Sequence, residues 1–267
     1  MPTEMPTELP SVQAPTIEPT VIPTTMEPTT ITPTTFPPIP IVVVPEGMVS
    51  DPETVESIEE TVLTCKGYNE TEFILKRLPK MKSIVIRDNC FGNVRVFELD
   101  GLSELESVVI GQQSFTIDSD ERSDYSYRIV NCPRLKSIQI GDESFWDYHS
   151  IELNNLPSLQ SIMIGDRCFG KVRVFELDGL SELESVVIGK ECFTYAKTYD
   201  DIWNSKRSDG SCRIVNCPKL KSIQIGYHSF SDCHSFELSN LPSLQSIYIG
   251  MECFYWATSF SLTGLID

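Results

Sequence analysis

A motif of fixed length recurs along this chain and constrains its fold more than any other feature. It reads Phe-x-Leu-x-x-Leu-Pro-x-Leu-x-Ser-Ile-x-Ile-Gly-x-x-Cys/Ser-Phe and is complete at 236–254. A period of this size predicts a solenoid, whose repeats stack and present a long surface. The second apolar residue of the motif recurs every 24 residues, with two intervals of 30 and 37, at Leu75, Leu99, Ile129, Leu153, Leu177, Ile214, Leu238 and Leu262. The two longer intervals indicate insertions after Phe115 and Phe193.

Each repeat contains two segments with the apolar pattern of a short strand. Residues 244–249 place apolar side chains at positions 1, 4 and 6, and Phe175-Glu176-Leu177 alternates with period two. Repeats stacked about 4.8 Å apart would form two parallel sheets around a common core. We therefore predict a β-rich solenoid over 71–267, with coils of about 24 residues, two short parallel strands per coil, seven repeats and a truncated eighth.

The sequence Leu-x-x-Ile-x-Ile followed by Gly-x-x-small-Phe resembles the BspA-like (bacterial-surface-antigen) class of leucine-rich repeats. The resemblance covers roughly residues 70–267. It implies a leucine-rich repeat fold and an adhesin-like role at a cell surface. Fold alone does not fix function, so this role is an expectation by analogy.

The segment before the repeats has a different composition. Residues 1–45 contain 12 prolines and 11 threonines, which predicts a disordered, extended spacer. Such Thr/Pro density is typical of an O-glycosylated stalk in a secreted protein, and an unmodified tail is the alternative. Residues 46–70 are predicted to form a linker and an N-terminal cap. A helix is expected at about 51–63, because Ser50-Asp51-Pro52-Glu53 resembles a capping box and the apolar spacing that follows is helical.

The chain is acidic, with a formal net charge of -17, and it has no Lys or Arg before Lys66. This charge disfavours nucleic acid and anionic membranes as partners. The apolar run 39–44 is too short to cross a bilayer, so no transmembrane segment is expected. The opening residues lack the features of a signal peptide, which predicts either an intracellular protein or a missing amino terminus. Localisation stays open, with the Thr/Pro segment favouring the cell surface.

The cysteines follow the repeat rather than a disulfide or metal pattern. Cys90, Cys168, Cys192 and Cys253 share one repeat position with Ser114, Ser144 and Ser229. A position that accepts Cys or Ser predicts a small buried side chain. No Cys-x-x-Cys pair, nucleophile elbow or phosphate loop occurs. We therefore expect no metal, no cofactor and no enzymatic activity.

Two regions are candidate binding surfaces. The fifth position of the first strand is unusually apolar for an outward face, which indicates a partner-binding strip at Met163, Val187, Gln224 and Tyr248. β-propensity alone is the other explanation for this strip. The longer insertion contains residue types that dominate interfaces, at Tyr195, Tyr199, Trp203 and Arg207. A poorly ordered surface loop is the alternative there.

Charged residues form a column along the outward face of the second strand, at Glu98, Arg128, Glu152, Glu176, Arg213 and Glu237. Each Arg is flanked by Glu, so opposite-charge pairs should fix the strand register.

Together these patterns predict a non-enzymatic module that binds a protein or a glycan. Two alternatives stay open. One is an intracellular scaffold that self-associates through an apolar carboxyl-terminal end, and the other is a fragment of a larger multidomain protein.

Overall fold

The computed structural model describes residues 60–63, 71–76, 78, 80–116, 125–195 and 209–265, with residues 60–63 described as backbone only. Every described residue lies in Ile39–Asp267, the second of the two units into which the chain divides. All regular elements in these residues are β-strands, and every strand pair is parallel. The predicted β-rich repeat architecture with parallel strands is therefore confirmed. The same residues include no helix that could span a bilayer.

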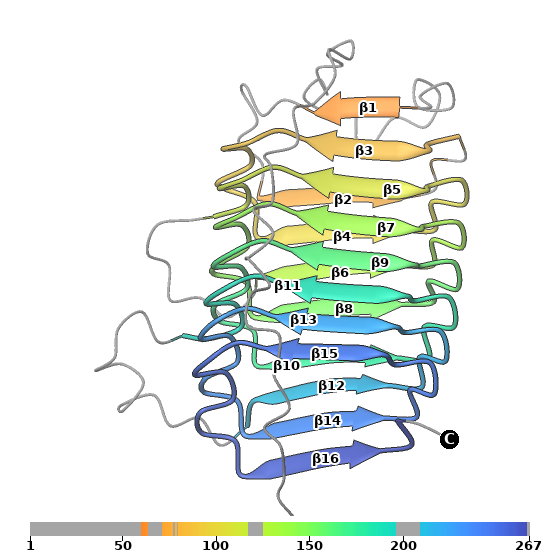
Figure 1. Cartoon of the computed structure of the whole chain (residues 1–267). Helices are drawn as coiled ribbons and strands as arrows, with labels where there is room; N and C mark the ends of the chain where they lie inside the picture. Colours follow the sequence, from red (N-terminus) through yellow and green to blue (C-terminus); the bar gives the residue numbers. More distant parts are fainter. Residues whose placement is uncertain are drawn as a thin grey trace, which may run out of the picture. The chain divides into compact units, whose positions relative to one another are not determined.

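One strand of each repeat belongs to a continuous eight-stranded sheet, here called the first wall (Figure 1). Successive strands along this sheet come from successive repeats, so the chain leaves the sheet and returns to it once per repeat. The first wall contains β1 (Glu60–Leu63), β3 (Ser83–Ile86), β5 (Ser107–Ile110), β7 (Ser137–Ile140), β9 (Ser161–Ile164), β11 (Ser185–Ile188), β13 (Ser222–Ile225) and β15 (Ser246–Ile249).

The other strand of each repeat belongs to the second wall, which differs from the prediction. A single sheet was expected, but the wall consists of two four-stranded sheets that are not paired to each other. The first of them contains β2 (Glu72–Lys76), β4 (Val96–Asp100), β6 (Ser126–Val130) and β8 (Ser150–Asn154). The second contains β10 (Val174–Asp178), β12 (Ser211–Val215), β14 (Ser235–Ser239) and β16 (Ser259–Thr263). The sheets thus separate between β8 and β10.

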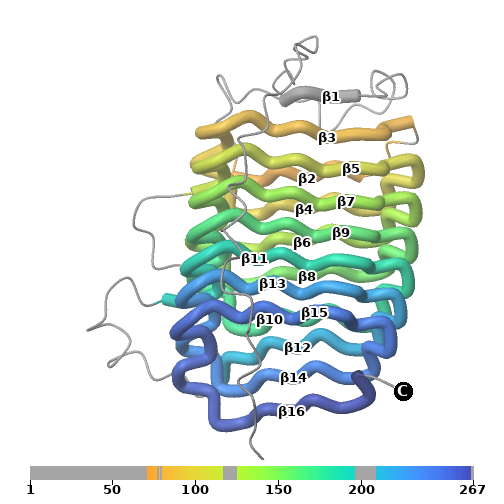
Figure 2. Tube along the Cα trace, in the orientation of Figure 1, coloured from red at the N-terminus to blue at the C-terminus, as the bar shows by residue number. Residues whose placement is uncertain are grey.

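The tube in Figure 2 shows the chain alternating between the two walls along the stack. Equivalent residues of successive repeats pair directly, as Ser161 does with Ser185 and Ser185 with Ser222. A slip of one residue would turn the buried side chains outward, so the apolar alternation fixes this register. This repeated parallel-strand architecture fits a solenoid-like fold.

The core between the walls contains a column of phenylalanine rings. Neighbouring rings stack with centroids 4.7 to 5.4 Å apart along Phe91, Phe115, Phe145, Phe169, Phe193, Phe230 and Phe254. All seven have positive φ, between 53 and 60°. This backbone conformation is unfavourable for a bulky residue, so burial and ring stacking must offset its cost.

Glycine is required where first-wall strands end, because successive repeats approach closely there. A Cβ on Gly226 would lie 2.6 Å from the carbonyl carbon of Gly189, and one on Gly189 would lie 2.5 Å from that of Gly165. Real Cβ atoms do not approach backbone so closely. The recurring Gly after Ile-x-Ile therefore sets the spacing of the repeats.

The predicted helix at 51–63 is wrong at its carboxyl-terminal end. Residues Glu60–Leu63 form β1, which pairs with β3 from Glu60↔Ser83 to Leu63↔Ile86. The open edge of the first wall offers unpaired backbone groups, and the β-branched residues Thr61 and Val62 favour a strand. Residues 51–59 and the predicted spacer at 1–45 lie outside the described residues.

Candidate functional site

The outward face of the first wall consists of two columns of side chains. In each strand from β3 to β15 the first and third residues point outward, while the second and fourth are buried in all but the last strand, β15. The first position is serine in every strand from β3 to β15. The third position of the strand is the fifth position of the apolar segment typified by 244–249, so it carries the predicted binding strip.

The structure brings four of the predicted site residues into one row. Met163 pairs with Val187, Val187 with Gln224, and Gln224 with Tyr248. Met163 and Val187 are half-buried, Gln224 is exposed, and Tyr248 is 61% exposed. The strip, defined as these four residues, therefore combines apolar, amide and phenol groups on a regular face.

Ion pairs border the serine column on the side away from the strip. The residue before each serine is charged in several repeats, and Lys136 Nζ lies 2.7 Å from Glu106 Oε2. Lys221 Nζ lies 2.8 Å from Glu184 Oε2 in the corresponding place. The hydrogen bond from each lysine lowers the pKa of its glutamate. These pairs keep one margin of the face polar and solvated.

The other predicted site residues belong to the longer insertion. Tyr195 is 45% exposed, and its backbone N–H donates to Asp232 Oδ2 at 3.3 Å. The structure therefore anchors the start of the insertion to the following repeat. Tyr199, Trp203 and Arg207 lie outside the described residues, so their role stays a prediction.

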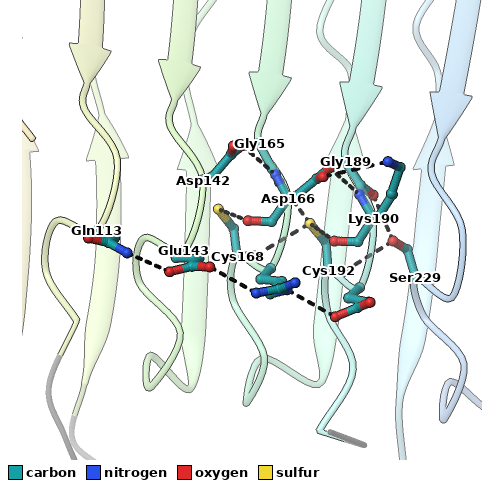
Figure 3. Close-up of polar contacts among 12 residues, drawn as sticks. Gln113, Asp142, Glu143, Gly165, Asp166, Cys168, Gly189, Lys190, Cys192 and Ser229 are labelled. Atoms are coloured by element: carbon teal, nitrogen blue, oxygen red, sulfur yellow. Dashed lines mark hydrogen bonds and ion pairs between the residues drawn. The ribbon is translucent and has the colours of Figure 1, made fainter. Parts of the chain in front are cut away.

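The shared Cys/Ser position forms a hydrogen-bonded column inside the turns (Figure 3). Cys192 Sγ donates to the carbonyl oxygen of Gly165 at 2.9 Å and accepts from the backbone N–H of Cys168 at 3.5 Å. Ser229 Oγ makes the equivalent bonds to Gly189 and Cys192, at 2.8 and 3.1 Å. The predicted small buried side chain is confirmed, and the structure adds its reason. The position needs one group that both donates and accepts.

The thiols are unsuited to nucleophilic chemistry. The eight described cysteines are free, and all except the half-buried Cys253 are buried. Burial raises the pKa of Cys168 and Cys212 well above the ordinary thiol value, and raises that of Cys217 to about 11. A thiol with a raised pKa supplies little thiolate at neutral pH. In the described part of the chain, no cluster of three or more His, Cys, Asp or Glu could hold a metal ion.

The predicted opposite-charge pairs on the second wall are present. Arg128 bonds to Glu98 and, through Nε at 2.9 Å, to Glu152. Arg213 bonds in the same way to Glu176 and, at 2.8 Å, to Glu237. Hydrogen bonds to Glu152 and Glu237, respectively, are the main cause of a raised pKa in Arg128 and Arg213. Both arginines thus remain charged and hold three strands in register.

Sequence reasoning missed a second polar column beside these ion pairs. Asn155 Nδ2 donates to Asn131 Oδ1 at 2.9 Å, and Asn131 Nδ2 donates to Asp100 Oδ1 at 2.8 Å. Asn131 and Asn155 have positive φ, as does Gly101 at the equivalent position. Gly and Asn are the residues that most readily adopt this conformation. The presence of Gly or Asn at this one repeat position is the sequence pattern from which the column could have been predicted.

Comparison with known proteins gives no match: neither a family model, nor a curated protein, nor a solved structure matches the chain.

Proposed function

We propose that this chain is a non-enzymatic binding module that presents the outward face of its first wall to a protein or glycan ligand. The observation that carries the proposal is the strip of Met163, Val187, Gln224 and Tyr248, which parallel pairing aligns in a single row. A regular row of apolar and hydrogen-bonding groups suits an extended ligand, because each repeat can contribute one contact. The insertion after Phe193, which contains Tyr195, adds a second contact region.

The finer assignment rests on the sequence motif. We propose that the repeats are leucine-rich repeats of the BspA-like type and that the Thr/Pro segment acts as a spacer that holds them away from a cell surface. The parallel strands and the 24-residue spacing of paired residues support this assignment. An adhesin-like surface role follows from the same resemblance.

The test is binding of the purified full chain to an array of defined glycans and to a displayed peptide library. Val187→Lys and Tyr248→Ser alter the strip at outward positions. Each should raise the dissociation constant of a captured ligand about tenfold, which corresponds to about 1.4 kcal/mol. Glu98→Gln, on the second wall, is the matched control and should leave binding unchanged. Binding that survives both strip variants would refute this surface.

A second candidate, self-association of a scaffold, is favoured by the last described repeat. Phe260 and Leu262 on β16 are 58% and 57% exposed, whereas the paired residues of β14 are buried. We propose that this face stacks on a repeat of the same pattern in a second copy. Light scattering should then show a dimer whose dissociation constant rises at least tenfold in Leu262→Glu, about 1.4 kcal/mol. A wild-type chain that stays monomeric at high concentration would exclude this candidate.

A further inference from the structure

The second wall is interrupted at one place while the first wall runs past that place without a break. β9 pairs with β11 over all four residues from Ser161↔Ser185 to Ile164↔Ile188, but β8 and β10 of the same two repeats belong to different sheets. Figure 1 shows β8 and β10 as neighbouring strands of the second wall. The interruption therefore affects only one side of the stack.

The sequence of β10 does not itself cause the interruption. Residues 94–111 and 172–189 are identical, and they include β4 and β10. β4 nevertheless pairs with the preceding strand over five residues, from Glu72↔Val96 to Lys76↔Asp100. The same peptide pairs with the preceding strand in one repeat and not in the other, so the cause lies in the preceding strand.

The preceding strands differ in charge. Continuing the 24-residue register would place Glu152 of β8 opposite Glu176 of β10. At the paired junction, Ile74 is opposite Glu98, and Lys76 Nζ lies 3.1 Å from Glu98 Oε2. Glu152 and Glu176 instead form ion pairs with arginines on the far sides, Arg128 and Arg213. Like charges placed directly opposite each other in neighbouring strands destabilise their pairing.

The chain contains an equivalent junction three repeats later, between β14 and β16. There Ser261 stands at the position of the second glutamate. These strands pair over five residues, with Glu237 opposite Ser261. Among the described junctions of the second wall, the one that juxtaposes two glutamates is the one that is not paired.

The second polar column stops at the same junction. Asn155, Asn131 and Asp100 form one hydrogen-bonded run, and Asn240, Asn216 and Asp178 form another, with bonds of 2.7 to 2.9 Å.

Val174 at the start of β10 is 49% exposed, and the core-facing Ile151 and Leu153 of β8 are only half-buried. Equivalent core residues of β6 and β12 are fully buried.

We propose that the juxtaposition of Glu152 and Glu176 divides the repeats into two blocks that hinge at the β8/β10 junction. The first wall acts as the hinge line, because β9 and β11 stay paired and Gly189 packs on Gly165. The turn also stays joined, through Lys171 N–H to Trp146 O at 3.2 Å and Lys171 Nζ to Asp147 Oδ1 at 2.7 Å. Opening on the second wall changes the tilt of β9 against β11, where Met163 and Val187 of the strip meet.

Amide hydrogen exchange of the full chain tests the hinge. Because 94–111 and 172–189 are identical, each peptide must extend beyond this stretch at one end to be assigned, to Asn93 or Lys171, or to Gln112 or Lys190. In the wild type, amides of β10 should exchange about fivefold or more faster than those of β4, since one of its edges lacks a partner. Equal exchange of the two identical strands would refute the interruption.

Two variants test its cause. Glu176→Ser copies the paired β14/β16 junction and should slow exchange in both β8 and β10 by about fivefold. The reciprocal variant Ser261→Glu should speed exchange in β14 and β16 by a similar factor. Glu98→Ser is the control, because it removes bonds to Lys76 and Arg128 and should slow no strand. Unchanged exchange in Glu176→Ser, with the chain folded by circular dichroism, would show that like charge does not cause the interruption.

Discussion

Replacement of Cys192 distinguishes hydrogen bonding from simple packing at the Cys/Ser column. In Cys192→Ala, the carbonyl oxygen of Gly165 and the N–H of Cys168 both lose the bonds that Sγ makes at 2.9 and 3.5 Å. Each buried backbone group left unsatisfied costs about 1–3 kcal/mol. Because bonds to sulfur are weak, the loss of both should lower the free energy of unfolding by an amount near the lower end of this range, about 2–3 kcal/mol in total.

Cys192→Ser is the matched control because serine occupies this position in three other repeats. Its hydroxyl can donate and accept as Ser229 does, so the variant should stay within about 1 kcal/mol of the wild type. Urea unfolding followed by circular dichroism measures both variants. If alanine and serine destabilise the chain equally, the column is a packing feature and the hydrogen-bond argument fails.

Three further predictions concern the spacing of the repeats, the charges and the thiols. Gly226→Ala should destabilise the chain by about 3 kcal/mol or more in urea unfolding, because its Cβ would overlap the Gly189 backbone, whereas Gly101→Ala, which has open space, should cost about 1 kcal/mol from its positive φ alone. The hydrogen bond from Arg213 lowers the pKa of Glu237, so its stabilisation is complete above the unfolded pKa near 4.5 and is lost as pH falls through the folded value. Thermal melts between pH 6 and pH 3 should therefore fall less steeply for Glu237→Gln, and an equal slope would exclude this pair as a contributor. Burial raises the pKa of Cys217 to about 11, so the stability it contributes is complete below the ordinary thiol pKa of 9.0 and is lost as pH rises toward 11. Reaction with a thiol reagent at pH 8 should be slow at Cys217 until urea unfolds the chain, and rapid labelling of the native chain would contradict its burial.

The repeat period determines most of what the structure shows. The apolar alternation of Phe175-Glu176-Leu177 places the inner and outer side chains correctly, because a strand has only two faces. The strip from Met163 to Tyr248 is likewise a consequence of equal spacing. The local apolar pattern and the constant register are together sufficient to predict which side chains face the core and which residues line up in the strip.

Features that depend on what lies beside a strand were harder to predict. The helical spacing of Val55, Ile58 and Val62 gave no sign that 60–63 would pair with the edge of the first wall. Positive φ at Phe91 and its equivalents contradicts residue preference and follows only from the ring column. Glu152 and Glu176 are visible in the sequence, but a constant period predicts a continuous second wall and therefore gives no sign of a break between them.

The ring column also shows how the fold accommodates extra chain. The two long intervals of the repeat lie between Phe115 and Phe145 and between Phe193 and Phe230, yet both ring pairs have centroids 4.7 Å apart, closer than several pairs joined by the basic period. The chain just after Phe115 and Phe193 therefore accepts extra residues without disturbing the stacking of the rings on either side. The position after the stacked phenylalanine is therefore one where a loop of different length and sequence can be inserted into any repeat. Binding specificity can change there while the strands and the core stay the same.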